Sequence, residues 1–149
     1  GEVFSKGFEL SAVGNPIKGL NIIAGFSKNR SEQVSGDSTY NGLRPEEAGP
    51  ETLINFWANY KIQQGNFRNF VAGFGFNHAS EHKTLNRTGI GTFELPSYTI
   101  ANAMIGYHPE KYSVSLKLDN IGNTKYYSGW STVTPQRLRT LSLALGFNF

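Results

Sequence analysis

Large apolar side chains alternate with small or polar ones along most of the chain. From residue 141 to 149, Leu or Phe occupies every odd position, and Ser, Ala, Gly or Asn every even one. Successive side chains of a β-strand point to opposite faces, so this pattern predicts strands with one apolar and one polar face. The same period of two predicts seven strands, over residues 8–12, 20–27, 54–62, 70–77, 98–107, 112–119 and 141–149. In the strand 98–107 the faces are less distinct, and we favour an apolar face made of Ala101, Ala103, Ile105 and Tyr107.

The connections between these strands alternate between two lengths. Short turns at 15–19, 63–66 and 108–111 contain Gly, Pro or Asn, the residues of ordinary hairpin turns. Long connections at 29–51, 80–94 and 128–137 hold much of the remaining Gly, Pro, Glu and Arg. Short turns at one end of a sheet and long loops at the other are typical of an outer-membrane β-barrel. A soluble sandwich or lipocalin can share this layout.

The composition of the two faces favours the membrane. Only four charged residues fall on the predicted polar face, namely Glu9, Lys61, Lys117 and Asp119. A face in bulk water usually carries more Lys and Glu, whereas small neutral side chains suit a lumen filled by water or by another domain. On the apolar face, aromatic residues gather near the short turns, as in the aromatic girdle of a membrane protein. We expect this interfacial position for Tyr60, Tyr107, Tyr112, Phe147 and the terminal Phe149.

Composition narrows the functional classes further. Lys and Arg number 14 against 11 Asp and Glu, a net charge of +3 without any basic run, so no nucleic-acid partner is expected. The absence of cysteine rules out a disulfide scaffold, a thiolate zinc site and a cysteine nucleophile. No apolar run is long enough to predict a transmembrane helix. The chain opens without a signal-peptide pattern, so we expect a mature form or a fragment.

Four segments in order resemble a known family. They are SKGFELSAVGNPIKGLNIIAGFS (5–27), LPSYTIANAMIGY (95–107), LKLDNIGNTKYYSGW (116–130) and RTLSLALGFNF (139–149). Together they resemble the C-terminal barrel strands of TonB-dependent outer-membrane receptors of the siderophore type. Two departures leave the subfamily open: Gly122-Asn123-Thr124 replaces a common Phe-Asp-Lys, and Asn102 stands where Asp is common.

The resemblance implies an all-β fold, an antiparallel transmembrane β-barrel segment that supplies the last seven strands of a 22-stranded barrel. Residues 1–149 would be the C-terminal part of that barrel, with the plug domain absent from this chain. A sheet of seven strands would leave two edges whose backbone groups are unpaired, which is too costly in lipid. We therefore expect the chain to be one part of a larger structure. The implied location is the bacterial outer membrane.

The implied function is TonB-dependent uptake of a ferric siderophore, with this segment forming barrel wall and extracellular loops. The implied partners are the rest of the receptor, the TonB complex through the plug, the barrel-assembly machinery, outer-membrane lipid and the ferric siderophore. No cofactor is expected, and iron enters only within the transported chelate. The alternatives are a passive porin, a TonB-dependent sugar or peptide receptor and, ranked lower, a soluble β-barrel carrier.

No catalytic or metal site is predicted. His78, Glu81 and His82 match the H-x-x-E-H pattern of zinc peptidases, but an extended chain holds residues i and i+4 roughly 13 Å apart, too far to share a metal. Glu46 and Glu47 lie in a loop and are expected to be solvated. The sequence therefore predicts no enzyme.

The remaining candidate residues are ligand contacts and an assembly signal. Aromatic rings and guanidinium groups suit anionic ferric chelates. The loop residues chosen on this basis are Tyr40, Arg44, His82, Arg87 and Trp130. A C-terminal aromatic on an alternating strand resembles the signal read by the barrel-assembly machinery, and this role is predicted for Phe149.

Overall fold

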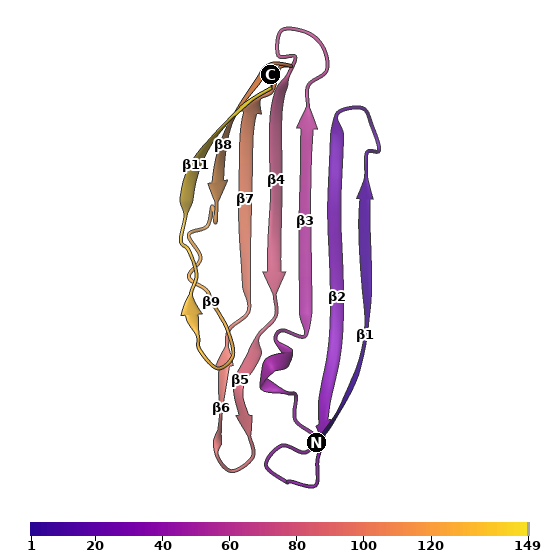
Figure 1. Ribbon diagram of the computed structural model, residues 1–149, viewed down its shortest axis with the longest axis vertical. Coiled ribbons are helices and arrows are strands. Elements are labelled where there is room, and N and C mark those ends of the chain that lie inside the picture. Colours follow the sequence, from indigo (N-terminus) through magenta and orange to yellow (C-terminus); the bar gives the residue numbers. More distant parts are fainter. Residues whose placement is uncertain (149) are drawn as a thin grey trace.

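Seven long strands form one antiparallel sheet in which each strand pairs with the next long strand of the chain (Figure 1). The structure is a computed structural model and describes residues 1–148. The fold class and the seven strands predicted from the sequence are confirmed. The strands are β1 (Glu2–Gly14), β2 (Leu20–Val34), β3 (Thr52–Lys61), β4 (Phe70–Ala79), β7 (Tyr98–Tyr107), β8 (Tyr112–Asp119) and β11 (Thr140–Phe147).

Smaller elements lie within the long connections. A single 3-10 turn, η1 (Glu46–Ala48), interrupts the connection from β2 to β3. Strands β5 (His82–Arg87) and β6 (Gly91–Leu95) form a separate hairpin between β4 and β7, and β9 (Tyr127–Ser128) pairs briefly with β10 (Thr134–Pro135). Within residues 1–148 no helix is long and apolar enough to cross a membrane, a finding that says nothing of a β-barrel.

All three long connections predicted as loops contain strand; in 128–137 it is limited to the short pair β9 and β10. The first pair of strands is longer than expected, because Glu2 of β1 pairs with Val34 at the end of β2. The prediction that residues 29–34 belong to a loop is therefore wrong, as is the assignment of 80–94 to loop throughout. Both extensions carry polar residues on both faces, so the alternation that reveals a strand is lost there. Period-two patterns report a strand only where its faces meet different surroundings.

The strand register places the alternating apolar residues of all seven strands on one face of the sheet. Phe26 pairs with Ile54, Phe56 with Phe76, and Leu143 with Leu116. The apolar face favoured for the strand 98–107 is confirmed, since Ile105 pairs with Ala72 and Tyr107 with Phe70. One face is thus continuously apolar across seven strands, and the other face carries the small and polar residues.

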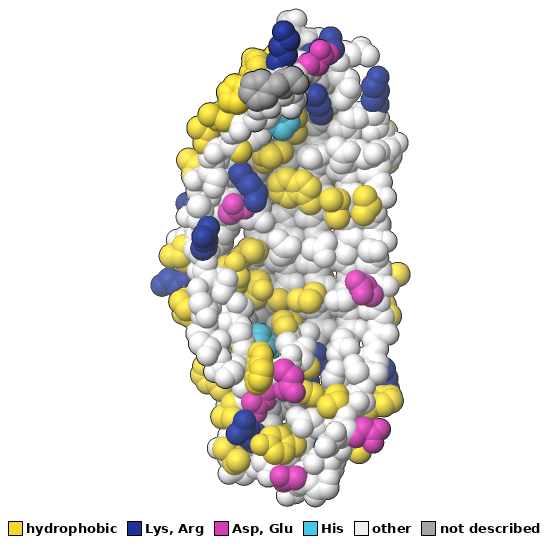
Figure 2. Space-filling model, in the orientation of Figure 1, with side chains coloured by type: hydrophobic (Ala, Val, Ile, Leu, Met, Phe, Trp, Pro, Cys, Tyr) yellow, Lys and Arg dark blue, Asp and Glu magenta, His cyan; other side chains and the backbone are white. Residues whose placement is uncertain are grey.

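Two glycines of β4 make room for Trp57 on the polar face. A Cβ atom added to Gly73 would lie 2.7 Å from the Trp57 ring, and one added to Gly75 would lie 2.6 Å from it. Glycine at these two positions of β4 therefore lets the indole lie against the neighbouring strand. Figure 2 shows one face of the molecule, on which backbone and uncharged polar side chains predominate over the middle of the sheet.

The sheet has almost no core of its own. Among the described residues the buried apolar side chains are only Pro45, Val71, Ala79 and Leu95, and no large side chain is fully buried. Residues of the apolar face are instead open, with Phe147 exposed by 69%. Strands β1 and β11 lie at opposite edges and do not pair, so the chain does not close into a small barrel. An apolar sheet face of this extent needs an apolar environment outside the chain.

The predicted interfacial aromatics gather at the short-turn end of the apolar face. The rings of Tyr107 and Tyr112 lie 6.1 Å apart, and Phe147 pairs with Tyr112 in the register. Tyr60 pairs with Leu20 beside the first short turn. Their placement fits a membrane–water boundary, and the interfacial role stays a prediction. Phe149, the predicted assembly signal, lies outside the described residues.

Candidate functional site

The long connections gather at one end of the sheet, opposite the short turns (Figure 1). Two neighbouring groups of side chains form there. We call the first the loop junction, defined by Tyr40, Arg44, Glu46, Asn86 and Arg87. We call the second the aromatic pocket, whose ring-bearing residues are His82, Tyr98, Tyr127 and Trp130. The short turn η1 belongs to both groups, because Glu46 faces the junction and Glu47 lines the pocket.

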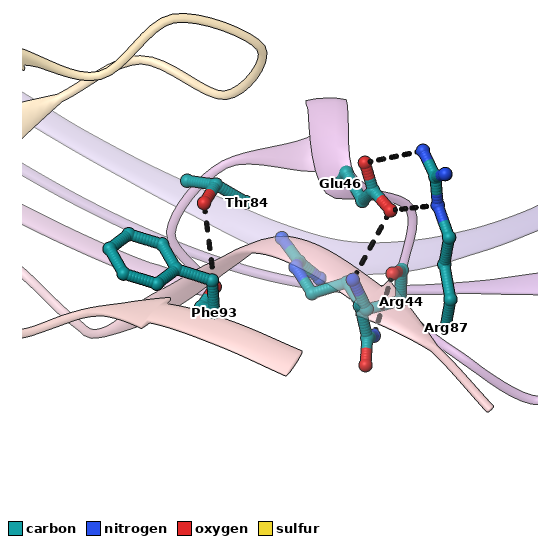
Figure 3. A network of polar contacts seen from close by, with 6 residues as sticks. Arg44, Glu46, Thr84, Arg87 and Phe93 are labelled. Carbon is teal, nitrogen blue, oxygen red and sulfur yellow. Dashed lines mark hydrogen bonds and ion pairs between the residues drawn. The ribbon is translucent and has the colours of Figure 1, made fainter. Parts of the chain in front are cut away.

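Glu46 and Arg87 form the centre of the loop junction (Figure 3). The Arg87 Nε atom donates to Glu46 Oε1 at 2.9 Å, and the backbone amide of Asn86 donates to the same oxygen at 3.2 Å. The Glu46 side chain is only 12% exposed. The expectation that Glu46 is solvated is therefore wrong. These bonds join the connection that follows β2 to the β5–β6 hairpin across 41 residues of sequence.

The junction changes how both charged groups titrate. Burial alone raises the pKa of Glu46, but the hydrogen bonds from Arg87 and from the Asn86 amide, together with the Arg87 charge, bring it below its ordinary value. The hydrogen bond to Glu46 and the charge of its carboxylate raise the pKa of Arg87. Both shifts favour the charged pair, so the junction is held by an ion pair at neutral pH.

Arg44 is engaged with the backbone of its own connection. Its guanidinium donates to the carbonyl oxygens of Asn29 at 2.9 Å, Gly49 at 3.1 Å, and Ala48 and Pro50 at 3.3 Å each. Its own carbonyl accepts a bond of 3.0 Å from the Asn86 side chain. Desolvation lowers the pKa of Arg44. The guanidinium thus shapes the connection, and its donors are directed inward.

Tyr40 completes the junction. The Arg87 guanidinium carbon lies 5.7 Å from the centre of the Tyr40 ring, within the range of a cation–π contact. The Thr88 amide donates to the Thr39 carbonyl at 2.9 Å, so backbone and side chains both fasten these two segments together. Three of the five predicted ligand contacts, Tyr40, Arg44 and Arg87, are therefore brought to one place.

The aromatic pocket holds the other two predicted contacts, His82 and Trp130. It encloses a cavity of about 260 Å³. Leu53 and Tyr98 flank its floor on the polar face, because both pair with the buried Ala79 of β4. The pocket therefore lies on the inner side of the sheet at its long-loop end. Its size suits one moiety of a ligand, since whole drug-sized ligands occupy cavities of roughly 300–1,000 Å³.

Local backbone geometry directs Trp130 to this pocket. Gly129 has φ +118, and a Cβ there would collide with the Thr132 carbonyl oxygen, so only glycine fits the turn. The Gly129 carbonyl lies 3.3 Å from His82 Nε2, which must be the donor because a carbonyl only accepts. Trp130 itself remains 50% exposed and is available to a ligand.

Sequence reasoning did not identify several residues of the two groups. Tyr98 falls in a predicted strand and Tyr127 in a segment of the family resemblance, and no spacing relates Glu47 or Asn86 to the predicted contacts. The aromatic run Tyr126-Tyr127 ahead of Trp130 was the one available signal. The Tyr98 and Tyr126 rings lie 4.5 Å apart, which ties that run to the start of β7.

The two histidines of the H-x-x-E-H pattern point to different surroundings. His78 Nδ1 lies 2.8 Å from the Thr99 hydroxyl, with which it pairs on the apolar face, whereas His82 lines the pocket. In the described part of the chain, no three His, Cys, Asp or Glu side chains are grouped so as to hold a metal ion.

Comparison with known proteins gives a consistent result. The family model described as "TonB dependent receptor-like, beta-barrel" matches residues 1–121. The chain is 26% identical over 130 residues to the ferric-pyoverdine M114 receptor PbuA of Pseudomonas sp. (strain M114), covering 86% of this chain and 16% of that protein. It is 27% identical over 136 residues to the ferrioxamine receptor of Yersinia enterocolitica, covering 85% and 18%. The chain thus spans less than a fifth of these relatives.

Solved structures share the fold. The ferripyoverdine receptor of Pseudomonas aeruginosa superimposes with a TM-score of 0.80 at 18% identity, over 99% of this chain and 20% of that one. The ferric-catecholate import receptor Fiu of E. coli K12, in its closed form, gives a TM-score of 0.79 at 22% identity, over 97% and 21%. In both cases a piece of a larger barrel matches nearly the whole chain.

Proposed function

The chain belongs to the TonB-dependent receptor β-barrel family, and we propose that it forms part of a receptor that imports a ferric siderophore across the outer membrane. Proteins of this family reside in the outer membrane, so lipid covers the apolar face of the sheet. The long-loop end then faces the cell exterior and the short turns face the periplasm. The family consists of receptors and not of enzymes.

The fold indicates which parts of the receptor this chain supplies. Residues 1–149 supply seven strands of barrel wall and three extracellular connections. The plug domain and the other strands of a 22-stranded barrel come from the rest of the receptor, and the TonB complex acts through the plug. The barrel-assembly machinery recognises Phe149 and inserts the whole receptor into the membrane. No resident cofactor takes part, because iron travels inside the chelate.

One observation carries this proposal: the aromatic pocket opens on the inner side of the wall, at the outer end. A ligand that enters the barrel from outside passes that surface. The rings of Trp130 and Tyr127 can stack on flat or apolar parts of a chelate. The relatives are receptors for ferric pyoverdine and ferrioxamine, which favours a siderophore over a sugar or peptide. The family match ranks a passive porin below an energised receptor.

Uptake of labelled chelates tests the proposal. Cells lacking the receptor that contains this chain are compared with complemented cells, using radioactive iron in hydroxamate, catecholate and mixed chelates. We expect one chelate class to depend on the receptor. Equal uptake of all three classes with and without it would contradict the proposal.

A pocket variant then tests the site. Trp130→Ala should weaken binding of the transported chelate about tenfold, the loss of one well-placed aromatic contact. Phe67→Ala is the matched control, because Phe67 is also exposed but lies among the short turns. Normal binding by Trp130→Ala would remove the pocket from the proposal while leaving the transport class intact.

A further inference from the structure

Three cations lie on the outer side of the first two strands, beyond the apolar band. Lys28 pairs with Phe8 in the register, and Arg30 pairs with Lys6. Because side chains alternate between faces, these residues share the face of Phe26 and Leu10, which meets lipid. All three cations are exposed. We call Lys6, Lys28 and Arg30 the cation cluster.

The cluster begins at the rim of the apolar band. On this face Phe26 pairs with Ile54, and the next outward-facing residue of β2, Lys28, pairs with the polar Thr52. Arg30 lies two residues further out, about 7 Å along the strand. Phe8, which lies directly opposite Lys28, stacks on the Phe26 ring with a centroid distance of 5.5 Å. The cations therefore stand at the level where lipid headgroups follow acyl chains.

The described residues neutralise the cation cluster only in part. Lys6 and Arg30 lie directly opposite each other, an arrangement in which like charges destabilise a strand pair. Glu32 Oε2 approaches Arg30 at 3.7 Å. Glu2 lies further out on the same face, and in the part of the chain that the structure describes no carboxylate lies within ion-pair distance of Lys6 or Lys28. Three cations thus share one contacting carboxylate.

The neighbouring strands β3 and β4 carry no charge at the level of the cation cluster. At the level of Lys28, β3 presents Thr52, and Ser80 follows beside it at the end of β4. Neither is charged.

We propose that the cation cluster binds the phosphate groups of an anionic lipid of the outer leaflet. A phosphate between Lys6 and Arg30 relieves their repulsion, since it accepts hydrogen bonds from both. The acyl chains of the same lipid lie against Phe8, Leu10 and Phe26, which continue the site toward the bilayer centre. A free phosphate ion uses only the polar half of this surface. The proposal depends on the outer-membrane location and not on the cargo.

Binding of a defined lipid tests the proposal. The whole receptor containing this chain, purified in detergent, is titrated with bisphosphorylated lipid A and followed by native mass spectrometry. We expect Lys6→Gln/Lys28→Gln/Arg30→Gln to weaken binding about tenfold or more. The control Lys18→Gln/Arg68→Gln/Lys111→Gln removes the same charge from exposed positions at the short-turn end and should bind as the parent does.

Two further measurements distinguish a lipid phosphate from a free phosphate ion. Dephosphorylated lipid should bind the parent and the triple variant equally weakly, and inorganic phosphate at the same concentration should not displace lipid A. Displacement by phosphate, equal binding by parent and cluster variant, or equal weakening in the control would each overturn the proposal. If the cluster variant fails to fold, Glu32→Gln tests the proposal instead. This change frees Arg30 from its ion pair and should tighten binding of lipid A. Unchanged or weaker binding would contradict the site.

Discussion

The backbone amide of Asn120 donates a hydrogen bond of 2.9 Å to the side-chain oxygen of Asn102 on the neighbouring strand. Asn120 is 3% exposed and adopts φ +51 just after β8 ends. Its side chain donates to the Thr124 carbonyl at 2.8 Å and accepts from the Thr124 amide at 2.9 Å. One buried residue thus closes the turn that leads into the aromatic pocket.

Replacing Asn120 by alanine should lower the free energy of unfolding of the receptor by about 2–3 kcal/mol. The change leaves the Thr124 amide and carbonyl without their partner. It also places alanine, which lacks the side-chain hydrogen bonds of asparagine, at a positive φ. Urea unfolding in detergent, followed by gel mobility of the folded barrel, measures it. Asn102→Asp should cost less than about 1 kcal/mol because a carboxylate oxygen still accepts from the amide. Asn102→Leu should approach the cost of Asn120→Ala, and equal stability of all three variants would contradict the role of this pair.

Arginine on the lipid face should be far more costly than on the polar face. Leu143 is 64% exposed and pairs with Leu116 on the apolar side, while Ser142 points to the opposite side. Leu143→Arg, like Phe74→Arg, should cost about 2–4 kcal/mol near the bilayer centre. Ser142→Arg should cost much less unless it meets the packed plug. Refolding into lipid bilayers measures each value, and equal costs on both faces would refute the assignment of faces.

The loop junction should open in acid. The pKa of Glu46 is lowered from its ordinary value of 4.5, so the stabilisation is complete above that value and is lost as the pH falls through the lower pKa of the folded state. Hydrogen exchange of the Asn86 and Thr88 amides, corrected for the intrinsic rate, should therefore accelerate below pH 4.5. Glu46→Gln should exchange faster than the parent at neutral pH and lose the pH dependence. A parent protein whose exchange is unaffected by pH would show that the ion pair does not hold the junction.

Removal of Phe149 should slow insertion of the receptor in cells. The inserted fraction should bind its chelate with nearly unchanged affinity, because β11 ends beside the short turn at 108–111, where the Asn148 amide donates to the Lys111 carbonyl, at the opposite end of the sheet from the pocket. Pulse labelling of membrane fractions gives the insertion rate, and Phe149→Tyr, which keeps an aromatic ring, should insert nearly as the parent does. Normal insertion combined with poor binding would contradict an assembly role.

The sequence predicts the transmembrane part of this fold well and its outer part poorly, for one physical reason. Between Leu20 and Phe26 a strand has lipid on one side and the lumen on the other, so its side chains alternate. Between Asn29 and Val34 both faces of the same strand lie beyond the apolar band, and nothing imposes alternation. The strand therefore continues through these residues, but the hydrophobic pattern does not reveal it.

The candidate site shows a related limit. Aromatic and basic residues of the long connections were identified because few other chemistries suit an anionic ligand. Their partners were not, since the contact between Glu46 and Arg87 joins segments 41 residues apart with no local signal. Arg44 illustrates the converse: its residue type indicated a ligand contact, whereas the structure surrounds it with carbonyl groups. Residue type predicts where a contact can be made, and only the folded connections decide which groups remain free.

The strict order of the sheet, in which strands adjacent in sequence are adjacent in space, makes the circumference of the barrel adjustable in steps. Loss or duplication of one hairpin changes the perimeter by two strand spacings, roughly 9.6 Å, and leaves the direction of every other strand unchanged. Each surviving strand keeps its partner on at least one side. A wall of this kind can widen or narrow over evolutionary time by whole hairpins, each of which brings or removes its own connecting loop.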